Sequence, residues 1–433
     1  ASCHDSPESG EPSVSSADLK GWSRRPLGKC ARWYAGGTPR KSQAEYWGGS
    51  IPWISAKSLT EFYVRDSDRR VTELGAENGT RLVPEGPVII VVRGMSLKSE
   101  FRIGITKRPV TFNQDLKALR AVEGVEPLFL AYAIKSRTDQ ILALVDEAGH
   151  GTGRLPTDLL ESIELPFPPL PEQRRIAAAL GALDDKIELN RQMNATLEEM
   201  AQAVFKSWFI DFDGHDDLVE SALGMIPRGW EVRPLLDFAQ LISGGTPKTS
   251  EPSFWGGPIK WASAKDVSQC PNRYLVDTER AITEAGLNGS STKVIPKGSV
   301  VVVARGATCG RWCVFGDAIA MNQTCYALAA RRPEHIEFIK HLVPSIIDHL
   351  VRQAHGSVFD TITTRTFKTA KVVIPPDESI TRFSETVGPI ERRILTAIHE
   401  SGTLADLRDT LLPKLVASEI RIAEAEEEVE AVV

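Results

Sequence analysis

The chain has 433 residues, 42% of them hydrophobic and 25% charged, with a formal net charge of −6. These values are typical of a globular protein of two to four domains. No apolar run approaches the roughly 18 residues that a membrane helix needs. The six cysteines have neither the spacing of a disulfide framework nor that of a zinc site. We therefore expect a cytoplasmic protein with free thiols, no bound metal and no membrane contact.

The charge is unevenly distributed along the chain. Residues 20–165 carry 22 Lys/Arg and 17 Asp/Glu, a net of +5, and residues 228–374 carry 18 and 12, a net of +6. Residues 417–433 have six glutamates against one arginine, a net of −5. Two mildly basic regions permit DNA binding through local patches. Residues 1–20 are rich in Ser, Pro and Glu, which predicts a disordered tail, and the acidic tail 419–433 is expected to be solvated.

Residues 171–209 are predicted to form one long helix. Their apolar and small residues repeat at steps of four and three, which is the pattern of a helix that packs on a partner helix. A second seam returns 207 residues later, and polar residues lie in the middle of both. The first seam is Ile176, Leu180, Leu183, Ile187, Asn190, Asn194, Leu197, Ala201, Val204 and Trp208. The second is Phe383, Val387, Ile390, Ile394, Ala397, Ser401, Leu404, Arg408, Leu411 and Leu415. The alternative is two unrelated amphipathic helices in separate cores.

The 207-residue shift between the two helices is part of an internal duplication that covers most of the chain. GWSRRPL (21–27) recurs as GWEVRPL (229–235), and GGTPRKSQAEYWGGSIPWISAK (36–57) recurs as GGTPKTSEPSFWGGPIKWASAK (244–265). VPEGPVIIVVRG (83–94) matches IPKGSVVVVARG (295–306), and FNQ (112–114) matches MNQ (321–323). The predicted order is therefore domain, helix, domain, helix.

Each domain is predicted to be α+β. Residues 88–92 and 300–303 are typical of buried strands, residues 126–137 and 334–353 of helices, and the Gly/Pro/Trp-rich blocks of loops. We expect domains at 21–170 and 229–378, helices at 171–212 and 379–418, and a linker at 213–228. That linker is too short to retrace comfortably a helix of about 57 Å. It favours antiparallel helices, an intramolecular coiled coil and a pseudo-twofold arrangement with the domains at opposite ends.

These motifs, together with PPLPEQRRIAAAL (168–180) before the first helix, resemble the DNA-specificity subunit of type I restriction–modification systems. The resemblance extends from about Ala17 to about Ser418. It implies two target recognition domains that each read half of a bipartite site in double-stranded DNA. It also implies that the helices set the half-site spacing and bind two methylation subunits, which motor/nuclease subunits can join. S-adenosylmethionine and the adenine-N6 chemistry are expected in those partners, in a bacterial or archaeal cytoplasm. The second helix begins with DESITRFSETV (377–387) instead, which predicts weaker partner binding there.

Several polar residues of the shared motifs are candidates for DNA contact. Arg and Lys at strand ends can contact phosphate or guanine, and Asn and Gln can pair with adenine. These candidates are Lys57, Arg93, Asn113, Gln114, Lys265, Arg305, Asn322 and Gln323. The alternatives are structural ion pairs for the cations and turn capping for the amides. Trp47, Trp53, Trp255 and Trp261 are expected in the scaffold rather than stacked on bases. His150 and His355 precede Gly-rich loops that either close on DNA or are plain surface loops.

Residues that read bases should differ between the domains wherever the two half-sites differ. The similarity of the domains leaves open the alternative of related half-sites and a partly palindromic target. The unshared candidates are Arg40, Lys41, Gln43, Ser96, Lys98 and Arg102 in the first domain and Lys248, Thr249, Ser250, Thr308 and Arg311 in the second.

The sequence lacks the phosphate loop, the methyltransferase motif, the dinucleotide fingerprint and a nuclease carboxylate cluster. We therefore expect a non-catalytic chain without a cofactor of its own. One rival interpretation is a duplicated coiled-coil scaffold that binds only protein, which would lack salt-dependent affinity for DNA. A second is a fused modification or nuclease enzyme, which the missing motifs disfavour.

Overall fold

The computed structural model describes residues 21–148, 151–354 and 361–433. The predicted disordered tail 1–20, His150 and His355 lie outside these ranges. The chain divides into two units, Ala1–Ile187 with Thr403–Val433 and Glu188–Gly402. We call these the first and the second unit. Each contains one α+β domain and one segment of each of the two long helices, α6 (Leu170–Phe209) and α11 (Asp377–Val416).

The domain of the first unit is built on a five-stranded and a four-stranded sheet. In sheet order, the larger consists of β2 (Ala31–Ala35), β11 (Leu116–Ala121), β7 (Val88–Val91), β9 (Ile103–Thr106) and β4 (Tyr63–Val64), all antiparallel except β9–β4. The smaller consists of β5 (Arg70–Val71), β3 (Trp47–Ile54), β10 (Val110–Phe112) and β6 (Arg81–Val83), with β3 and β10 parallel. Two minor sheets contain β1 (Ser23–Pro26) with β14 (Glu164–Phe167), and β12 (Asp146–Ala148), β13 (Thr152–Arg154) and β8 (Arg93–Gly94).

The domain of the second unit repeats the strand order of the two larger sheets and of the β1–β14 pair. Its five-stranded sheet consists of β18 (Ala239–Ser243), β26 (Cys325–Ala330), β23 (Val300–Val303), β24 (Trp312–Phe315) and β20 (Tyr274–Leu275). Its four-stranded sheet consists of β21 (Arg280–Ile282), β19 (Trp255–Ala262), β25 (Ile319–Met321) and β22 (Val294–Ile295), and β17 (Glu231–Pro234) pairs with β27 (Lys371–Ile374). The predicted duplication is thus a duplication of fold.

Short helices complete both domains. The first unit has α1 (Leu27–Cys30), α2 (Glu73–Glu77), α3 (Pro127–Lys135), α4 (Thr138–Leu142) and α5 (Thr157–Ser162). The second has α7 (Ala264–Ser268), α8 (Glu284–Asn288), α9 (Ile336–Ala354) and α10 (Thr364–Thr369). The helices α3 and α9 pack against the five-stranded sheet of their own unit. The region expected to be a plain linker contains a hairpin, β15 (Leu218–Ser221) with β16 (Gly224–Pro227).

The Gly/Pro/Trp-rich blocks, which were predicted to be mostly loop, lie outside strands over most of their length, but each also contains a strand. This strand, β3 or β19, has eight residues, and its pairing register shifts just after its first Trp. A β-bulge absorbs the extra residues in such strands. Gly48 there has φ +81°, which a side chain would disfavour. The bulge therefore explains why so much glycine is compatible with a strand.

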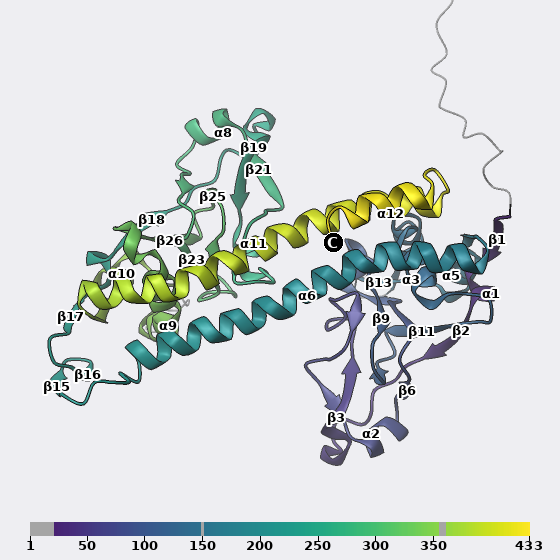
Figure 1. Ribbon diagram of the computed structural model, residues 1–433, viewed down its shortest axis with the longest axis horizontal. Coiled ribbons are helices and arrows are strands. Elements are labelled where there is room, and N and C mark those ends of the chain that lie inside the picture. Colours follow the sequence, from purple (N-terminus) through teal and green to yellow (C-terminus); the bar gives the residue numbers. More distant parts are fainter. Residues whose placement is uncertain (1–20, 149–150, 355–360) are drawn as a thin grey trace, which may run out of the picture. The chain divides into compact units, whose positions relative to one another are not determined.

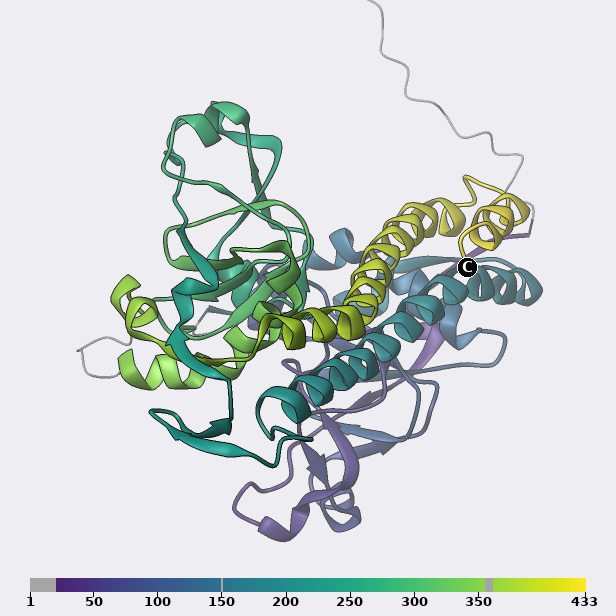
Figure 2. The same ribbon diagram turned by 60° about the vertical axis from the view of Figure 1, so that its left-hand side comes forward.

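The long helices run antiparallel in the second unit (Figures 1 and 2). Asn194 of α6 donates a hydrogen bond to the carbonyl of Ile394 at 3.4 Å, and Phe205 packs edge-on against Phe383 with ring centroids 5.8 Å apart. As the residue numbers rise along α6, those of the contacting residues of α11 fall, which is the antiparallel pattern. Asn190, 1% exposed, donates to the Glu400 carboxylate at 3.1 Å. Buried asparagines of this kind fix helix register at some cost in stability.

The seam side chains of both helices face inward. Most are buried, whereas Ile187, Leu197, Val204, Trp208, Ile390, Ser401 and Arg408 are half-buried. In the first unit, α6 and α11 are joined by an ion pair between Asp184 and Arg408. None of the helices in the described ranges is both long enough and apolar enough to cross a membrane.

The expectation of a solvated acidic tail is wrong. Residues Ile422–Glu430 form helix α12, which buries Ala425 and Val429 in the core of the first unit. Glu426 accepts a hydrogen bond from Arg175 Nε of α6 at 3.0 Å. The tail folds because Ile422, Ala425 and Val429 lie on one face of α12, while most of its glutamates are exposed.

Candidate nucleic-acid interface

Three of the shared motifs form one compact corner in the first unit. The Gly37 amide donates to the carbonyl of Phe112 at 2.9 Å, and Thr38 Oγ1 donates to Gln114 Oε1 at 2.7 Å. A side chain at Gly36 would overlap the carbonyl oxygen of Asn113, so only glycine fits there. The Arg93 amide in turn donates to Asp115 just after the Asn–Gln pair, at 3.2 Å. The GGTP, NQ and RG motifs are therefore neighbours because they build the corner together.

The same corner recurs in the second unit. The Gly245 amide donates to Met321 at 2.9 Å, Thr246 donates to Gln323, and the Ala304 amide donates to Thr324 at 2.8 Å. The shared glutamines thus have a partner in the GGTP turn, yet Gln114 and Gln323 stay exposed. This repetition identifies the corner as scaffold that holds exposed side chains around it.

The shared asparagines lie within their turns. Asn113, 7% exposed, accepts from the Asp115 amide at 3.1 Å and donates to the Asp115 carboxylate at 2.9 Å. Asn322 Oδ1 accepts from the Thr324 amide at 3.2 Å. These bonds favour turn capping over a direct adenine contact for both residues.

The shared tryptophans belong to the scaffold, as expected. Trp53 Nε1 donates to the carbonyl of Gly37 at 3.1 Å, and Trp261 Nε1 donates to that of Gly245 at the same distance. Trp47 stands edge-on to Trp53, with ring centroids 5.3 Å apart. The indole N–H groups of Trp53 and Trp261 therefore hold the GGTP turn of each domain.

Arg102 is half-buried and pairs with Glu100 at 2.9 Å, whereas the other predicted cationic side chains are exposed. They are Arg40, Lys41, Lys57, Arg93 and Lys98 in the first unit, and Lys248, Lys265, Arg305 and Arg311 in the second. The structure does not bring them all together. Lys57 and Arg93 belong to adjoining segments, since Gly94 of β8 lies beside Ala56. Lys41 instead lines an open hollow with Arg69, Arg70 and Trp47 at the four-stranded sheet.

The two units differ in how these cations are engaged. Lys265 donates to the Glu279 carboxylate at 2.7 Å, which raises the pKa of the lysine. Lys57, its counterpart, makes no ion pair with any residue in the described ranges. The alternative of a structural ion pair thus applies to Lys265 and not to Lys57. This difference gives the two corners unequal charge patterns on one scaffold.

Three arginines near the Trp pair were not among the predicted contact residues. Arg69 and Arg70 border the hollow beside Lys41, and Arg280 lies over the Trp255 ring, 3.4 Å from its centroid. The signal was present, because DRRVT (68–72) and ERAIT (279–283) belong to the same repeat. Arg69 and Arg280 match, whereas Arg70 has Ala281 as its counterpart.

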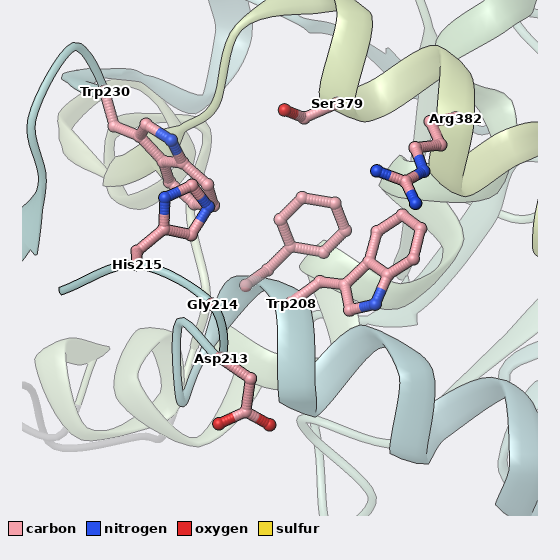
Figure 3. A pocket seen from close by; sticks show the side chains of 8 residues that line it. Trp208, Asp213, Gly214, His215, Trp230, Ser379 and Arg382 are labelled. Atoms are coloured by element: carbon pink, nitrogen blue, oxygen red, sulfur yellow. The ribbon is translucent and has the colours of Figure 1, made fainter.

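A separate cavity of about 370 Å³ lies in the second unit, where α6 ends and α11 begins (Figure 3). The Arg382 guanidinium lies over the Trp208 ring, 5.4 Å from its centroid, and His215 stands edge-on to Trp230. Trp and Arg are enriched at the energetic centres of protein–protein interfaces. No group of three His, Cys, Asp or Glu able to hold a metal occurs in the described part of the chain.

The fold is a duplicated α+β domain with exposed cationic side chains, attached to paired helices. These are features of a DNA-binding protein with two recognition domains. The family of the type I restriction modification DNA specificity domain matches residues 20–199 and again 227–400. The chain belongs to this family, and its role is DNA sequence specificity. Specificity subunits bind DNA and act with other restriction–modification subunits. That family role agrees with our prediction of a non-catalytic chain.

Individual relatives are similar over most of their length. The MjaIX specificity subunit of Methanocaldococcus jannaschii is 27% identical over 420 residues, 94% of this chain and 95% of the relative. The HindI specificity subunit of Haemophilus influenzae is 28% identical over 358 residues, 68% of this chain and 77% of the relative. The solved type I S subunit of M. genitalium has the same fold, with a TM-score of 0.53 at 15% identity over 91% of this chain and 96% of that one.

Proposed function

We propose that each domain reads one half of a bipartite target in double-stranded DNA, with the bases read by exposed residues around the corner. The observation that carries this is one scaffold with two charge patterns. Lys57 and the Lys41, Arg69 and Arg70 group belong to the first unit, whereas Lys265 is neutralised in the second. A common scaffold with different exposed side chains suits two half-sites of different sequence.

We further propose that the helix pair sets the distance between the half-sites. A 40-residue helix is about 60 Å long. Asn190 and Asn194 are hydrogen-bonded across the pair and so oppose slippage of one helix past the other. A spacer of fixed register is what recognition of two separated half-sites requires.

We propose one partner-binding surface on the second unit, beginning in the segment 377–387 where the sequence predicted weaker binding than at the first helix. Arg382 is followed at helical spacing by Thr386, Pro389 and Arg393 of α11, all exposed. The matching stripe of α6 in the first unit, 207 residues earlier, is covered in part by α12: Arg175 pairs with Glu426, and Ala179 is 7% exposed. A basic stripe next to an aromatic cavity fits an acidic helix from another chain. The expected partners are two methylation subunits carrying S-adenosylmethionine and the adenine-N6 chemistry, with motor/nuclease subunits as further components.

The deciding experiment is single-molecule mapping of methylated adenines in genomic DNA, with and without this gene. We expect one bipartite motif to lose its methylation on deletion. Lys57→Ala and Lys41→Ala in the first unit should then relax one half-site only, while Arg24→Ala, an exposed strand cation away from the corner, should change neither. A loss of both half-sites from Lys57→Ala would refute separate reading. Unchanged methylation in the deletion, with salt-independent DNA affinity of the purified complex, would refute DNA recognition.

A further inference from the structure

The two long helices each bury one carboxylate at the same position of the repeat. Asp184 of α6 and Glu391 of α11 are 207 residues apart, and their side chains are 5% and 1% exposed. A buried carboxylate is costly unless it is paired and hydrogen-bonded. The hydrogen-bond donors and the cation that contact each carboxylate are therefore essential parts of its unit.

In the first unit, Asp184 joins the domain to both helices. Its Oδ2 accepts a hydrogen bond from the Tyr132 hydroxyl of α3 at 2.6 Å. Its Oδ1 forms an ion pair with Arg408, which lies on the opposite helix α11 and is 13% exposed. Among the groups that contact Asp184 directly, the domain thus supplies a neutral hydroxyl and the helix pair supplies the cation. Lys135 of α3 pairs with the neighbouring Asp409 at 3.6 Å.

In the second unit, the equivalent carboxylate takes its cation from the domain. Glu391 Oε1 lies 2.8 Å from Arg273 and 2.8 Å from His341 Nε2 of α9, and Oε2 accepts from the Tyr274 hydroxyl. Arg273 immediately precedes strand β20. The α6 residue at the position of Arg408 in the repeat is Ala201, which is fully buried and uncharged.

The repeat shows that the cation has changed place. His341 corresponds to Tyr132, because Phe338–Ile339 of α9 aligns with Phe129–Leu130 of α3. Tyr274 corresponds to Tyr63, so Arg273 stands where the first unit has Phe62. Both halves keep a buried carboxylate bonded to the domain helix, through Tyr132 or His341. They differ in the second hydroxyl, since Tyr274 donates to Glu391 whereas Tyr63 donates to the carbonyl of Gly181, and in the origin of the positive charge.

We propose that this carboxylate anchors each recognition domain to the helix pair, and that the origin of its cation makes each domain fit its own half. A second-unit domain placed in the first half would bring Arg273 to a site that already holds Arg408. A first-unit domain placed in the second half would leave Glu391 without a cation. The proposal adds a compatibility rule to the proposed function, and it rests on that function only in treating the domains as recognition modules.

Moving the cation within the full-length chain tests the anchor. Breaking a buried ion pair should lower the thermal midpoint of the first unit by about 5–10 °C in Arg408→Ala. Phe62→Arg added to Arg408→Ala should recover at least half of that loss. Arg174→Ala, on the exposed face of α6 with its side chain 66% exposed, is the control and should shift the midpoint by less than about 2 °C.

A matching pair of substitutions in the second unit repeats the test, so that its outcome does not depend on a single variant that fails to fold. Arg273→Phe should destabilise the second unit, and Ala201→Arg added to it should restore stability. Arg408→Lys provides a milder change in the first unit, with a smaller loss in the same direction. If neither double variant is more stable than its single parent, the anchor proposal is overturned.

A domain exchange tests the compatibility rule. The chain is built with residues 229–374 in place of 21–167, with and without Arg408→Ala. The substitution that destabilises the parent should stabilise this chimera by several degrees, because it removes the surplus guanidinium. If Arg408→Ala destabilises both the parent chain and the chimera, the compatibility rule is overturned. These measurements need no DNA, so they stand apart from any failure of the proposed function.

A DNA readout separates positioning from simple stability. In the complex with its methylation subunits, at a temperature where the chain stays folded, Arg408→Ala should relax methylation at one half-site, and Arg273→Phe at the other. Phe62→Arg should restore the first effect. Relaxation of both half-sites by either single variant would refute the assignment of one anchor to each domain.

Discussion

The acid stability of the second unit should depend on one buried histidine. His341 is 3% exposed and bonded to Glu391 at 2.8 Å. Burial lowers the pKa of His341 to about 4, and its hydrogen bond to the carboxylate offsets this only in part. Burial alone would raise the pKa of Glu391, but the hydrogen bond with His341 and the charge of Arg273 outweigh it and hold that pKa at about 2. The histidine is therefore neutral beside an ionised glutamate.

The size of the effect follows from proton linkage. Between pH 6.5 and pH 4 the unfolded chain binds a proton at this histidine that the folded chain does not, so stability falls as the pH falls. At about 1.4 kcal/mol per pH unit, the loss is about 3 kcal/mol over the whole window and about 2 kcal/mol by pH 5. The contribution of Glu391 is present above pH 4.5 and is lost between pH 4.5 and pH 2, so the two windows barely overlap.

The assay is urea unfolding at pH 7.5 and at pH 5, followed by tryptophan fluorescence. His341→Gln keeps a donor for Glu391 but cannot titrate, so it should lose about 2 kcal/mol less than the parent between these pH values. His349→Gln, exposed on the same helix, is the control and should behave like the parent. If His341→Gln and the parent lose equal stability, the linkage argument is wrong.

Three further predictions concern the corner, the tail and the helix pair. Gly36→Ala should destabilise the first unit by more than about 3 kcal/mol in urea unfolding, because its Cβ meets the Asn113 carbonyl, whereas Gly402→Ala, open on α11, should stabilise by about 0.5–1 kcal/mol; equal effects would refute the packing argument. Ala425→Asp should lower the thermal midpoint far more than Glu426→Ala, since Ala425 is fully buried and the glutamate pairs near the surface; the reverse order would show that α12 is held by charge. Inserting one heptad into both α6 and α11 should lengthen the spacer in methylation maps and leave both half-sites unchanged; altered half-sites would refute the ruler.

Repetition made much of this architecture readable from the sequence. The 207-residue shift of the heptad seam predicted two long helices, and α6 and α11 have 40 residues each. The strand at Val300–Val303 was predicted to the residue, because a short β-branched run between Gly and Pro signals has few alternatives. Family membership and the role in DNA specificity were predicted from motifs and are confirmed. The boundaries of the recognition domains and the DNA-contacting residues stay predictions.

Local pattern failed where tertiary contacts override it. The Gly/Pro/Trp-rich block that contains Trp47–Ile54 was predicted to be mostly loop, yet a bulge and the pairing with β5 and β10 stabilise a strand there. Six glutamates predicted a solvated tail, yet Ala425 and Val429 find an apolar surface on the first unit. Neither surface can be seen in the segment itself.

The sequence by itself determined the duplication, the heptad seam, the family and the list of cations, since each is a pattern along the chain. Only the tertiary structure decided which cations are committed and to what. Lys265 and Lys57 occupy equivalent positions of the same motif. Of these two lysines, only Lys265 donates to a carboxylate within the described ranges, that of Glu279, 14 residues further along the chain. Asp184 and Glu391 are likewise equivalent in the repeat, and their cations come from residues more than 100 positions distant along the chain. Pairings across such separations depend on how the chain packs in space.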